Sequence, residues 1–146
     1  MSSSCLFCRI STCEIAAHRF YRDEEILAIP DLGQIRRGHA LIFPHAHVET
    51  FDQLEPGVAA RLLHLGQRIA RVQKKLYSVD RVAFLFSGGD IPHVHAHVVP
   101  MFEKTDITSR RYIAEADLTF RPIPPTPPDE LAAISAELRN GLSELE

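Results

Sequence analysis

The sequence predicts an α+β domain in which a mostly antiparallel sheet packs against one main helix and carries a C-terminal helical extension. Three observations support this class: several short apolar runs bounded by turn residues, one long apolar stripe with helical spacing, and a second such stripe near the C-terminus. The chain has 146 residues, of which 45% are hydrophobic and 24% are charged. That length and composition suit one folded domain with its own core.

Five apolar runs have the length and the boundaries of β-strands. The predicted strands cover residues 19–22, 25–30, 40–44, 81–87 and 93–102. A charged turn at Asp23–Glu24 separates the first two, and a loop bounded by Gly33 and Gly38 precedes the third. Because residues 81–87 (RVAFLFS) are apolar at nearly every position, we expect an interior strand there.

The main helix is predicted by apolar residues that recur at spacings of four and three. They are Val58, Leu62, Leu65, Ile69, Val72 and Leu76. Ahead of this stripe, Asp52 and Glu55 have the spacing of a capping box, and Pro56 suits a first helical turn. We expect the stripe to pack on the sheet, and its regularity also leaves room for a partner helix in a dimer.

A proline-rich linker at residues 122–128 leads into the predicted C-terminal helix. Thr126 is the expected cap, and the helix is expected to span Asp129 to Leu145. Its apolar stripe consists of Leu131, Ile134, Leu138, Leu142 and Leu145. We therefore expect a domain core at residues 1–102 and an extension, residues 103–146, packed on that core.

Charge and hydropathy exclude several classes of partner. The formal net charge is -3 with neutral histidines, so no basic field would draw the chain onto a nucleic acid polymer. No segment approaches the roughly 18 apolar residues of a membrane span, and the N-terminal MSSSCLFCRI lacks the apolar region of a secretory signal. Three cysteines are an odd number for a disulfide framework. We therefore expect a cytoplasmic protein with no membrane partner.

Three of the eight histidines stand at alternate positions in the stretch HVHAHVV, residues 93–99. In a strand, His93, His95 and His97 share one face with neighbours about 7 Å apart, while the residues between them face the core. A row of imidazoles suits a dry core poorly, because each ring needs partners for two nitrogens. An exposed sheet face and a bare metal site are the alternatives to the interpretation that we favour, catalysis by positioned imidazoles.

Cys5 and Cys8 form a Cys-x-x-Cys pair near the N-terminus. This spacing suits one zinc ion, which needs two more ligands from elsewhere in the chain. A redox dithiol is the competing interpretation, but such a pair normally opens a helix within a βαβ unit, and that context is absent from the sequence pattern. Cys13 stands outside the pair and is predicted to be a free thiol.

Several motifs together resemble the signature of the histidine triad (HIT) superfamily. The stretch from His93 to Val99 matches its His-x-His-x-His-x-x pattern, in which x is apolar. Other matching segments follow in the family's order: CLFCRI (5–10), EI (14–15), LAIPD (27–31), GHALIFP (38–44) and HVE (47–49). The resemblance covers about residues 5–102 and indicates a Hint-like or bacterial branch with a Cys-x-x-Cys zinc motif.

The resemblance implies a reaction at the α-phosphate of a nucleotide. His95 would be the nucleophile that forms a covalent nucleotidyl-histidine, which water or phosphate then releases. His97 would contact the phosphate and assist the leaving group, His93 opens the triad, and His39 matches a fourth histidine beside it. The implied activity is that of a nucleotide hydrolase or nucleotidyl transferase that acts on a phosphoramidate or a dinucleoside polyphosphate.

The resemblance also implies which residues hold the nucleotide and the metal. Asp31 would bind the ribose hydroxyls, and a turn residue bonded to its own backbone is the alternative. The implied walls of the base pocket are Leu6, Phe7, Ile10, Ile15, Ile29 and Leu32. The implied ligands of one structural zinc ion are Cys5, Cys8, His93 and His47, the last chosen over His45.

One segment departs from the family pattern. Gly89 stands where many members have a phosphate-binding Gln, and Asp90 where Ser or Thr is frequent. A carboxylate beside a phosphate is repulsive unless it is protonated or paired. Either the backbone N–H groups of Gly88 and Gly89 take over the phosphate contact, or the substrate differs. The cations expected to compensate are Arg36, Arg37, Lys104, Arg110 and Arg111.

The departure keeps a second function open, that of a zinc-containing nucleotide-binding protein with little or no turnover. A purely structural zinc protein is a weaker third hypothesis. Hint-like members are similar homodimers, in which a long helix and an edge strand pair across a two-fold axis. Closing a sheet edge against a second copy also removes an aggregation hazard, so we expect a symmetric homodimer.

Overall fold

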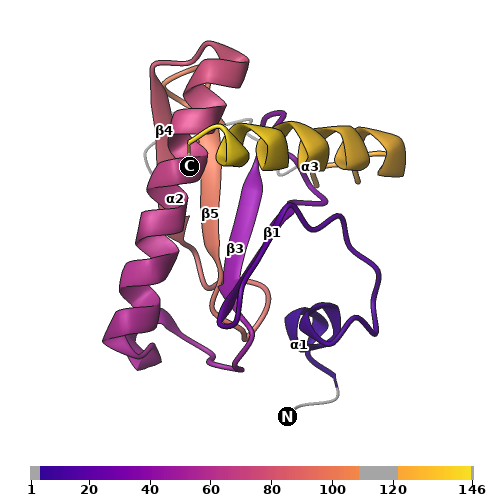
Figure 1. Cartoon of the computed structure of the whole chain (residues 1–146), viewed down its shortest axis with the longest axis vertical. Coiled ribbons are helices and arrows are strands. Elements are labelled where there is room, and N and C mark those ends of the chain that lie inside the picture. Colours follow the sequence, from indigo (N-terminus) through magenta and orange to yellow (C-terminus); the bar gives the residue numbers. More distant parts are fainter. Residues whose placement is uncertain (1–3, 109–121, 146) are drawn as a thin grey trace, which may run out of the picture.

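The computed structural model describes residues 4–108 and 122–145, which form a five-stranded sheet flanked by helices (Figure 1). The strands are β1 (Tyr21–Arg22), β2 (Ile26–Pro30), β3 (Ala40–Pro44), β4 (Arg81–Phe86) and β5 (Ala96–Met101). The helices are α1 (Leu6–Ser11), α2 (Pro56–Tyr77) and α3 (Pro128–Ser143), and a short 3-10 turn, η1, covers Phe51–Gln53. Within these residues, none of the helices combines the length and the apolar character needed to cross a membrane.

The sheet has the order β1-β2-β3-β5-β4, and every neighbouring pair is antiparallel. The predicted α+β class with an antiparallel sheet is therefore confirmed. After β3 the chain leaves the sheet through α2 and returns as the edge strand β4, and β5 then takes the place between β3 and β4. The register between β3 and β5 places Leu41 opposite His97, so the third triad histidine lies in the middle of the sheet.

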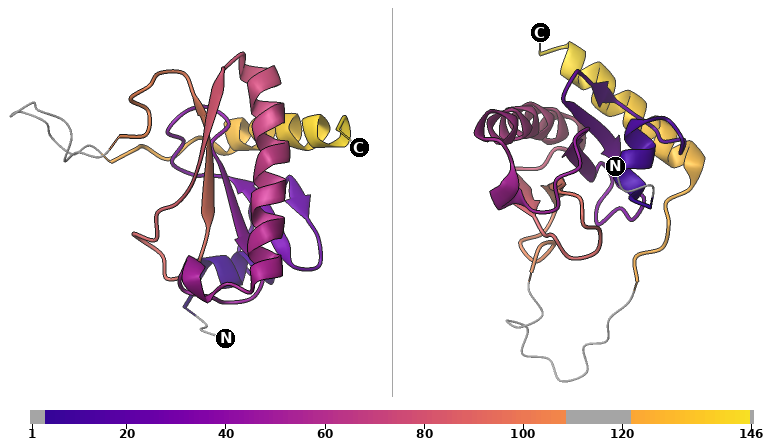
Figure 2. Two further views of the ribbon diagram at one scale, coloured as in Figure 1. Left: turned by 90° about the vertical axis from the view of Figure 1, so that its left-hand side faces the viewer. Right: turned by 90° about the horizontal axis from the view of Figure 1, so that it is seen from below.

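The two faces of the sheet carry separate apolar clusters. On one face, α2 and α3 pack against side chains that include Ile42, Val94 and Val98. On the other face, α1 packs against β2 and β3, and Phe7 and Phe43 stack with ring centroids 4.4 Å apart. Figure 2 shows α2 and α1 on opposite sides of the strands. His93 and His95 contact Phe7 of α1, and His97 lines a pocket together with residues of α1, so the three triad histidines face the α1 side.

The main helix α2 buries the centre of its predicted stripe, namely Leu62, Leu65, Ile69 and Val72, and exposes Leu76. The predicted capping box is wrong in one respect. Residues Phe51–Gln53 form the separate turn η1, which places Asp52 one turn ahead of the helix. Glu55 is the N-cap instead, and its carboxylate accepts a hydrogen bond of 3.1 Å from the backbone N–H of Val58.

The C-terminal helix α3 starts at Pro128, so the last proline of the predicted linker is its first residue. Thr126 does not cap this helix, because the cap position falls one residue later, on Pro127. The backbone N–H of Thr126 instead donates a 2.8 Å hydrogen bond to the carbonyl of Leu32. The predicted apolar stripe is buried up to Leu142, whereas Leu145 lies beyond the helix and is exposed. The boundary predicted between residues 102 and 103 stays a prediction.

Two strand predictions need correction. β5 begins at Ala96, three residues later than predicted, because the backbone N–H of Val94 bonds to the carbonyl of Val48 in the loop after β3. β4 is an edge strand, since among the described strands it pairs only with β5. Its apolar side chains are half-buried, so the continuous apolar run of residues 81–87 did not indicate an interior position.

Candidate active site and metal centre

A pocket of about 470 Å³ opens beside α1 and the end of β2. It is lined by both His95 and His97 and by every apolar residue predicted to wall a base pocket: Leu6, Phe7, Ile10, Ile15, Ile29 and Leu32. Asp31 also lines it. Gly88 and Gly89 are exposed in the turn after β4 and do not line the pocket. Their contact with a phosphate therefore stays a prediction.

Several lining residues were not predicted. His18 comes from the segment after α1, Ile91 from the loop before the triad, and Leu41 from β3. Thr126, Pro128 and Leu131 come from the start of α3 and the residues just before it. Only Leu41 carried a signal, because alternation in β3 places it opposite to the core residue Ile42. The others meet at the pocket only through the tertiary fold.

His95 borders the pocket with its ring fixed by the backbone. Its Nδ1 lies 2.7 Å from the carbonyl oxygen of His93. A carbonyl only accepts, so Nδ1 carries the proton and Nε2 keeps a lone pair. No described residue bonds to that Nε2. The ring of Phe7 packs against the imidazole with centroids 4.9 Å apart, which holds the ring in one orientation.

His39 and His97 form a direct imidazole pair. The Nε2 of His39 lies 2.9 Å from the Nδ1 of His97, and the backbone N–H of Ile35 donates to the Nδ1 of His39 at 3.3 Å. The proton of His39 therefore sits on Nε2 and is shared with His97, whose own proton sits on Nε2 and donates to the hydroxyl of Ser87 at 3.1 Å. Burial lowers the pKa of both His39 and His97 to about 4, so both rings are neutral near pH 7.

Asp31 lies at the junction of this pair and the pocket. Its Oδ1 accepts a 2.8 Å hydrogen bond from the backbone N–H of Gly33, the turn bond that was the alternative interpretation of this residue. Its Oδ2 lies 3.4 Å from the Nε2 of His39. Burial raises the pKa of Asp31. Because a carboxylate oxygen can accept more than one hydrogen bond, Oδ2 can still accept one from a hydroxyl at the pocket wall.

None of the described basic residues that were expected to compensate at the phosphate lines the pocket. Arg36 pairs with Asp106 at 2.7 Å, and Arg37 pairs with two glutamates of α3. Lys104 is exposed and does not line the pocket, while Arg110 and Arg111 lie outside the described residues. Asp90 does line the pocket. Among the described residues, the pocket is thus lined by three histidines, His18, His95 and His97, and by two aspartates, and by no lysine or arginine.

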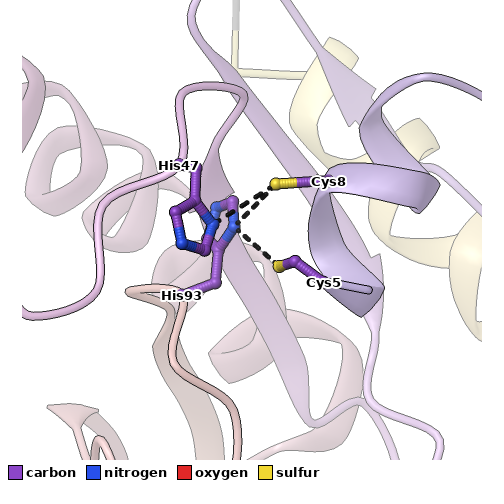
Figure 3. A group of neighbouring side chains, drawn as sticks. All are labelled: Cys5, Cys8, His47 and His93. Atoms are coloured by element: carbon purple, nitrogen blue, oxygen red, sulfur yellow. Dashed lines mark hydrogen bonds between the residues drawn. The ribbon is translucent and has the colours of Figure 1, made fainter. Parts of the chain in front are cut away.

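Four potential metal ligands converge behind the triad. The ligand atoms are the sulfurs of Cys5 and Cys8 and one ring nitrogen each of His47 and His93, and all four lie within 4.8 Å of one another. Figure 3 shows both sulfur atoms pointing toward the two imidazole rings. The Sγ atoms of Cys5 and Cys8 lie 3.4 and 3.6 Å from the Nδ1 of His93. The Sγ of Cys8 also lies 3.4 Å from the Nδ1 of His47. Ligand atoms around a tetrahedral zinc ion are roughly 3.5 Å apart, so the four side chains fit that ion.

The second nitrogen of His93 is also held in place. Its Nε2 lies 2.9 Å from the carbonyl oxygen of Pro44 and therefore carries the proton. The lone pair of Nδ1 then faces the two thiols, in the arrangement that orients histidine ligands in metal sites. The neighbouring His45 turns away and places its Nε2 3.0 Å from the carbonyl of Asp23. Cys13 is exposed and remains apart from the cluster.

An antiparallel sheet that aligns three histidines beside an apolar pocket defines a histidine triad protein. The profile of the HIT domain family matches residues 12–104, and the chain belongs to that family. The match ends before α3 and begins after Cys5 and Cys8, so the C-terminal helix and the cysteine pair lie outside it.

Known proteins are similar to this chain in sequence and in structure. The crystal structure of a Zn-bound histidine triad family protein from Mycobacterium smegmatis covers 99% of this chain and 97% of its own, at 30% identity and a TM-score of 0.75. The HIT-like protein MJ0866 of Methanocaldococcus jannaschii, itself uncharacterized, is 32% identical over 103 residues, 68% of this chain and 80% of its own. Adenosine 5'-monophosphoramidase hnt1 of Schizosaccharomyces pombe is 28% identical over 102 residues, 66% of this chain and 74% of its own.

Proposed function

We propose that the chain is a nucleotide hydrolase or nucleotidyl transferase that cleaves at the α-phosphate of a nucleotide conjugate. The observation that carries this proposal is the orientation of His95, whose Nδ1–H is bound by the carbonyl of His93 at 2.7 Å. This hydrogen bond selects the tautomer in which Nε2, at the border of the pocket, is the nucleophilic atom. The relative hnt1, named for its action on an adenosine monophosphoramidate, supports a phosphoramidate as substrate.

The reaction proceeds in two displacements at phosphorus. In the first, Nε2 of His95 bonds to the α-phosphorus and the bond to the leaving group breaks, which leaves a nucleotidyl-histidine. In the second, water attacks phosphorus and the bond to Nε2 breaks. The leaving group takes a proton from Nε2 of His97 as it departs in the first step. The attacking water returns one proton to His97 in the second step and supplies the oxygen that joins phosphorus. A dinucleoside polyphosphate reacts in the same way, with a nucleotide as the leaving group.

Two neighbours of His95 assist these steps. Neutral His97 donates its Nε2–H, which Ser87 accepts in the free protein, to an oxygen of the bound phosphate and to the leaving group. His39 keeps His97 in that tautomer through the 2.9 Å contact between their rings. The Oδ2 of Asp31 accepts hydrogen bonds from the ribose, while the apolar walls of the pocket hold the base.

The proposed cofactor is one structural zinc ion per chain, held by Cys5, Cys8, His47 and His93 in a closed tetrahedral set. The ion would join the N-terminal helix to the segment that bears the nucleophile, and it takes no part in the reaction. Burial and the adjacent Cys5 thiol raise the pKa of Cys8, whereas a redox pair needs a thiol of lowered pKa. Thiol ligands and a free Cys13 suit a reducing compartment, and we propose the cytoplasm.

A second candidate function rests on the turn before the triad. The pocket carries the carboxylate of Asp90 where a phosphate would bind, and neither Gly88 nor Gly89 reaches it. Such a pocket favours binding of a nucleotide with little turnover, because charge that develops on the phosphate lacks a compensating donor.

One experiment separates the two functions. The protein is mixed with adenosine 5'-phosphoramidate or diadenosine polyphosphate, and its intact mass is followed together with the release of AMP. A transient gain of one adenylyl group with formation of AMP supports the enzyme. Binding of the nucleotide without either signal supports the binding protein. The absence of both binding and product contradicts both functions.

A further inference from the structure

The apolar side chains of α3 pack in two places, the core beneath the helix and the pocket beside its first turn. Ile134, Leu138 and Leu142 belong to the cluster that α3 shares with α2 and the sheet. Leu131, one turn earlier, is only 7% exposed but belongs to neither apolar cluster. It lines the pocket that also contains His95 and His97. The helix is thus anchored by its later turns, and its first turn is presented to the pocket.

Polar contacts fix α3 to both segments that border the pocket on this side. The hydroxyl of Ser135 donates to the backbone carbonyl of His18 at 3.1 Å. Just before the helix, the N–H of Thr126 donates to the carbonyl of Leu32 at 2.8 Å. Arg37, in the loop that follows Leu32, pairs with Glu130 at 3.1 Å and Glu137 at 2.8 Å. These bonds hold the first turn of α3 at one position relative to the pocket.

We propose that Leu131 and Pro128 of α3 form a wall of the nucleotide pocket and set the size of the base that it accepts. This inference rests on the proposed function, because it concerns the same pocket. Apolar walls hold a flat ring by the area that they cover, so the wall supplied by α3 favours the larger purine ring. The family match ends at residue 104, so this specificity comes from a segment outside the HIT domain itself.

The test compares two leucines of the same helix. Leu131→Ala removes the side chain in the pocket, whereas Leu138→Ala removes one that is fully buried against α2 and the sheet. Dissociation constants for AMP and CMP are measured by calorimetry, at a temperature well below the unfolding transition of every variant. We expect wild type to bind AMP more tightly than CMP. Leu131→Ala is expected to bind AMP about ten-fold more weakly, and Leu138→Ala to melt earlier with unchanged affinity.

A second variant keeps the test independent of folding. Leu131→Phe fills part of the pocket and adds apolar volume, and it is expected to weaken AMP binding more than CMP binding. Unchanged AMP affinity in both Leu131 variants would overturn this inference and leave the proposed function standing. An equal loss of AMP affinity in Leu138→Ala would do the same. Wild-type protein that binds neither nucleotide would overturn the proposed function as well. Failure of the enzymatic proposal is seen separately, as the absence of phosphoramidate hydrolysis by wild type.

Discussion

The side-chain amide of Gln73 donates a 3.0 Å hydrogen bond to the backbone carbonyl of Val98, the residue that follows His97. The same Nε2 lies 2.8 Å from the carbonyl of Gly38, the residue that precedes His39. Gln73 is fully buried in α2. One amide therefore ties the main helix to both backbone segments that carry the paired imidazoles, and we expect Gln73 to position that pair.

Replacing Gln73 by methionine, which has a similar volume, removes both hydrogen bonds without leaving a cavity. We expect the free energy of unfolding to fall by roughly 1 kcal/mol or more, because two buried carbonyls each lose a partner. We also expect kcat for phosphoramidate hydrolysis to fall while KM changes little, since small displacements of catalytic groups are costly. Urea unfolding and steady-state kinetics measure the two effects.

Lys74→Met, at an exposed neighbouring position, is the control for these measurements. An unchanged kcat in Gln73→Met would contradict the positioning role.

Acid is expected to destabilise the fold through His39 and His97. Burial lowers the pKa of both from 6.5 to about 4. Between these values the unfolded chain binds protons that the folded chain excludes, so the free energy of unfolding falls as pH drops through this window. Urea unfolding at pH 7.5 and pH 5 gives the size of this loss. His39→Gln should shrink the difference, whereas His64→Gln, at an exposed site of α2, should not. Equal pH dependence in the two variants would speak against the buried pair.

His95→Ala is expected to abolish hydrolysis and to leave nucleotide affinity nearly intact. The substitution removes the proposed nucleophile, while the pocket walls and Asp31 remain in place. Product formation and the adenylyl mass gain are followed in parallel with AMP binding. His64→Ala serves as the matched histidine control. Residual turnover close to wild type in His95→Ala would rule out the assigned mechanism.

The zinc content of the protein is expected to depend on Cys8 and His47 but not on Cys13 or His45. Protein purified without a chelator should contain one zinc ion per chain, measured by plasma mass spectrometry. Cys8→Ser and His47→Ala should lose the ion and unfold at lower temperature, because metal binding contributes folding free energy. Cys13→Ser and His45→Ala provide the two controls. Zinc retained at full affinity in Cys8→Ser, or absent from wild type, would refute the site.

The exposed edge of the sheet is expected to pair with a second copy of the chain. β4 is an edge strand with half-buried apolar side chains, and Leu63 on α2 and Phe51 are 50% and 63% exposed. An unpaired apolar edge is a hazard that a symmetric dimer removes. Analytical ultracentrifugation at low micromolar concentration should show one dimeric species. A single monomeric species would show that these surfaces stay uncovered.

Local periodicity determined much of this protein from the sequence alone. Alternation in residues 93–99 places three imidazoles on one face and Val94 and Val98 in the core, because side chains in an extended chain alternate whatever the sheet contains. The four-three spacing in α2 predicts its buried side in the same way. The ordered set of motifs from Cys5 to Phe102 was specific enough to indicate the histidine triad family. It also indicated the cluster in which Cys5, Cys8 and His47 converge on His93.

The tertiary structure alone decided which distant segments meet. Nothing in the sequence around Gln73 shows that its side chain bonds to the backbone behind the paired imidazoles. Nothing around Leu131 shows that it lines the pocket, because both look like ordinary helix residues. The position of β4 at the sheet edge depends on the order of the strands. The ion pairs of Arg36 and Arg37, neither of which lines the pocket, depend on a turn and a helix far along the chain. Such contacts follow from the packing of whole elements, whereas sequence patterns report only the local repeat of each element.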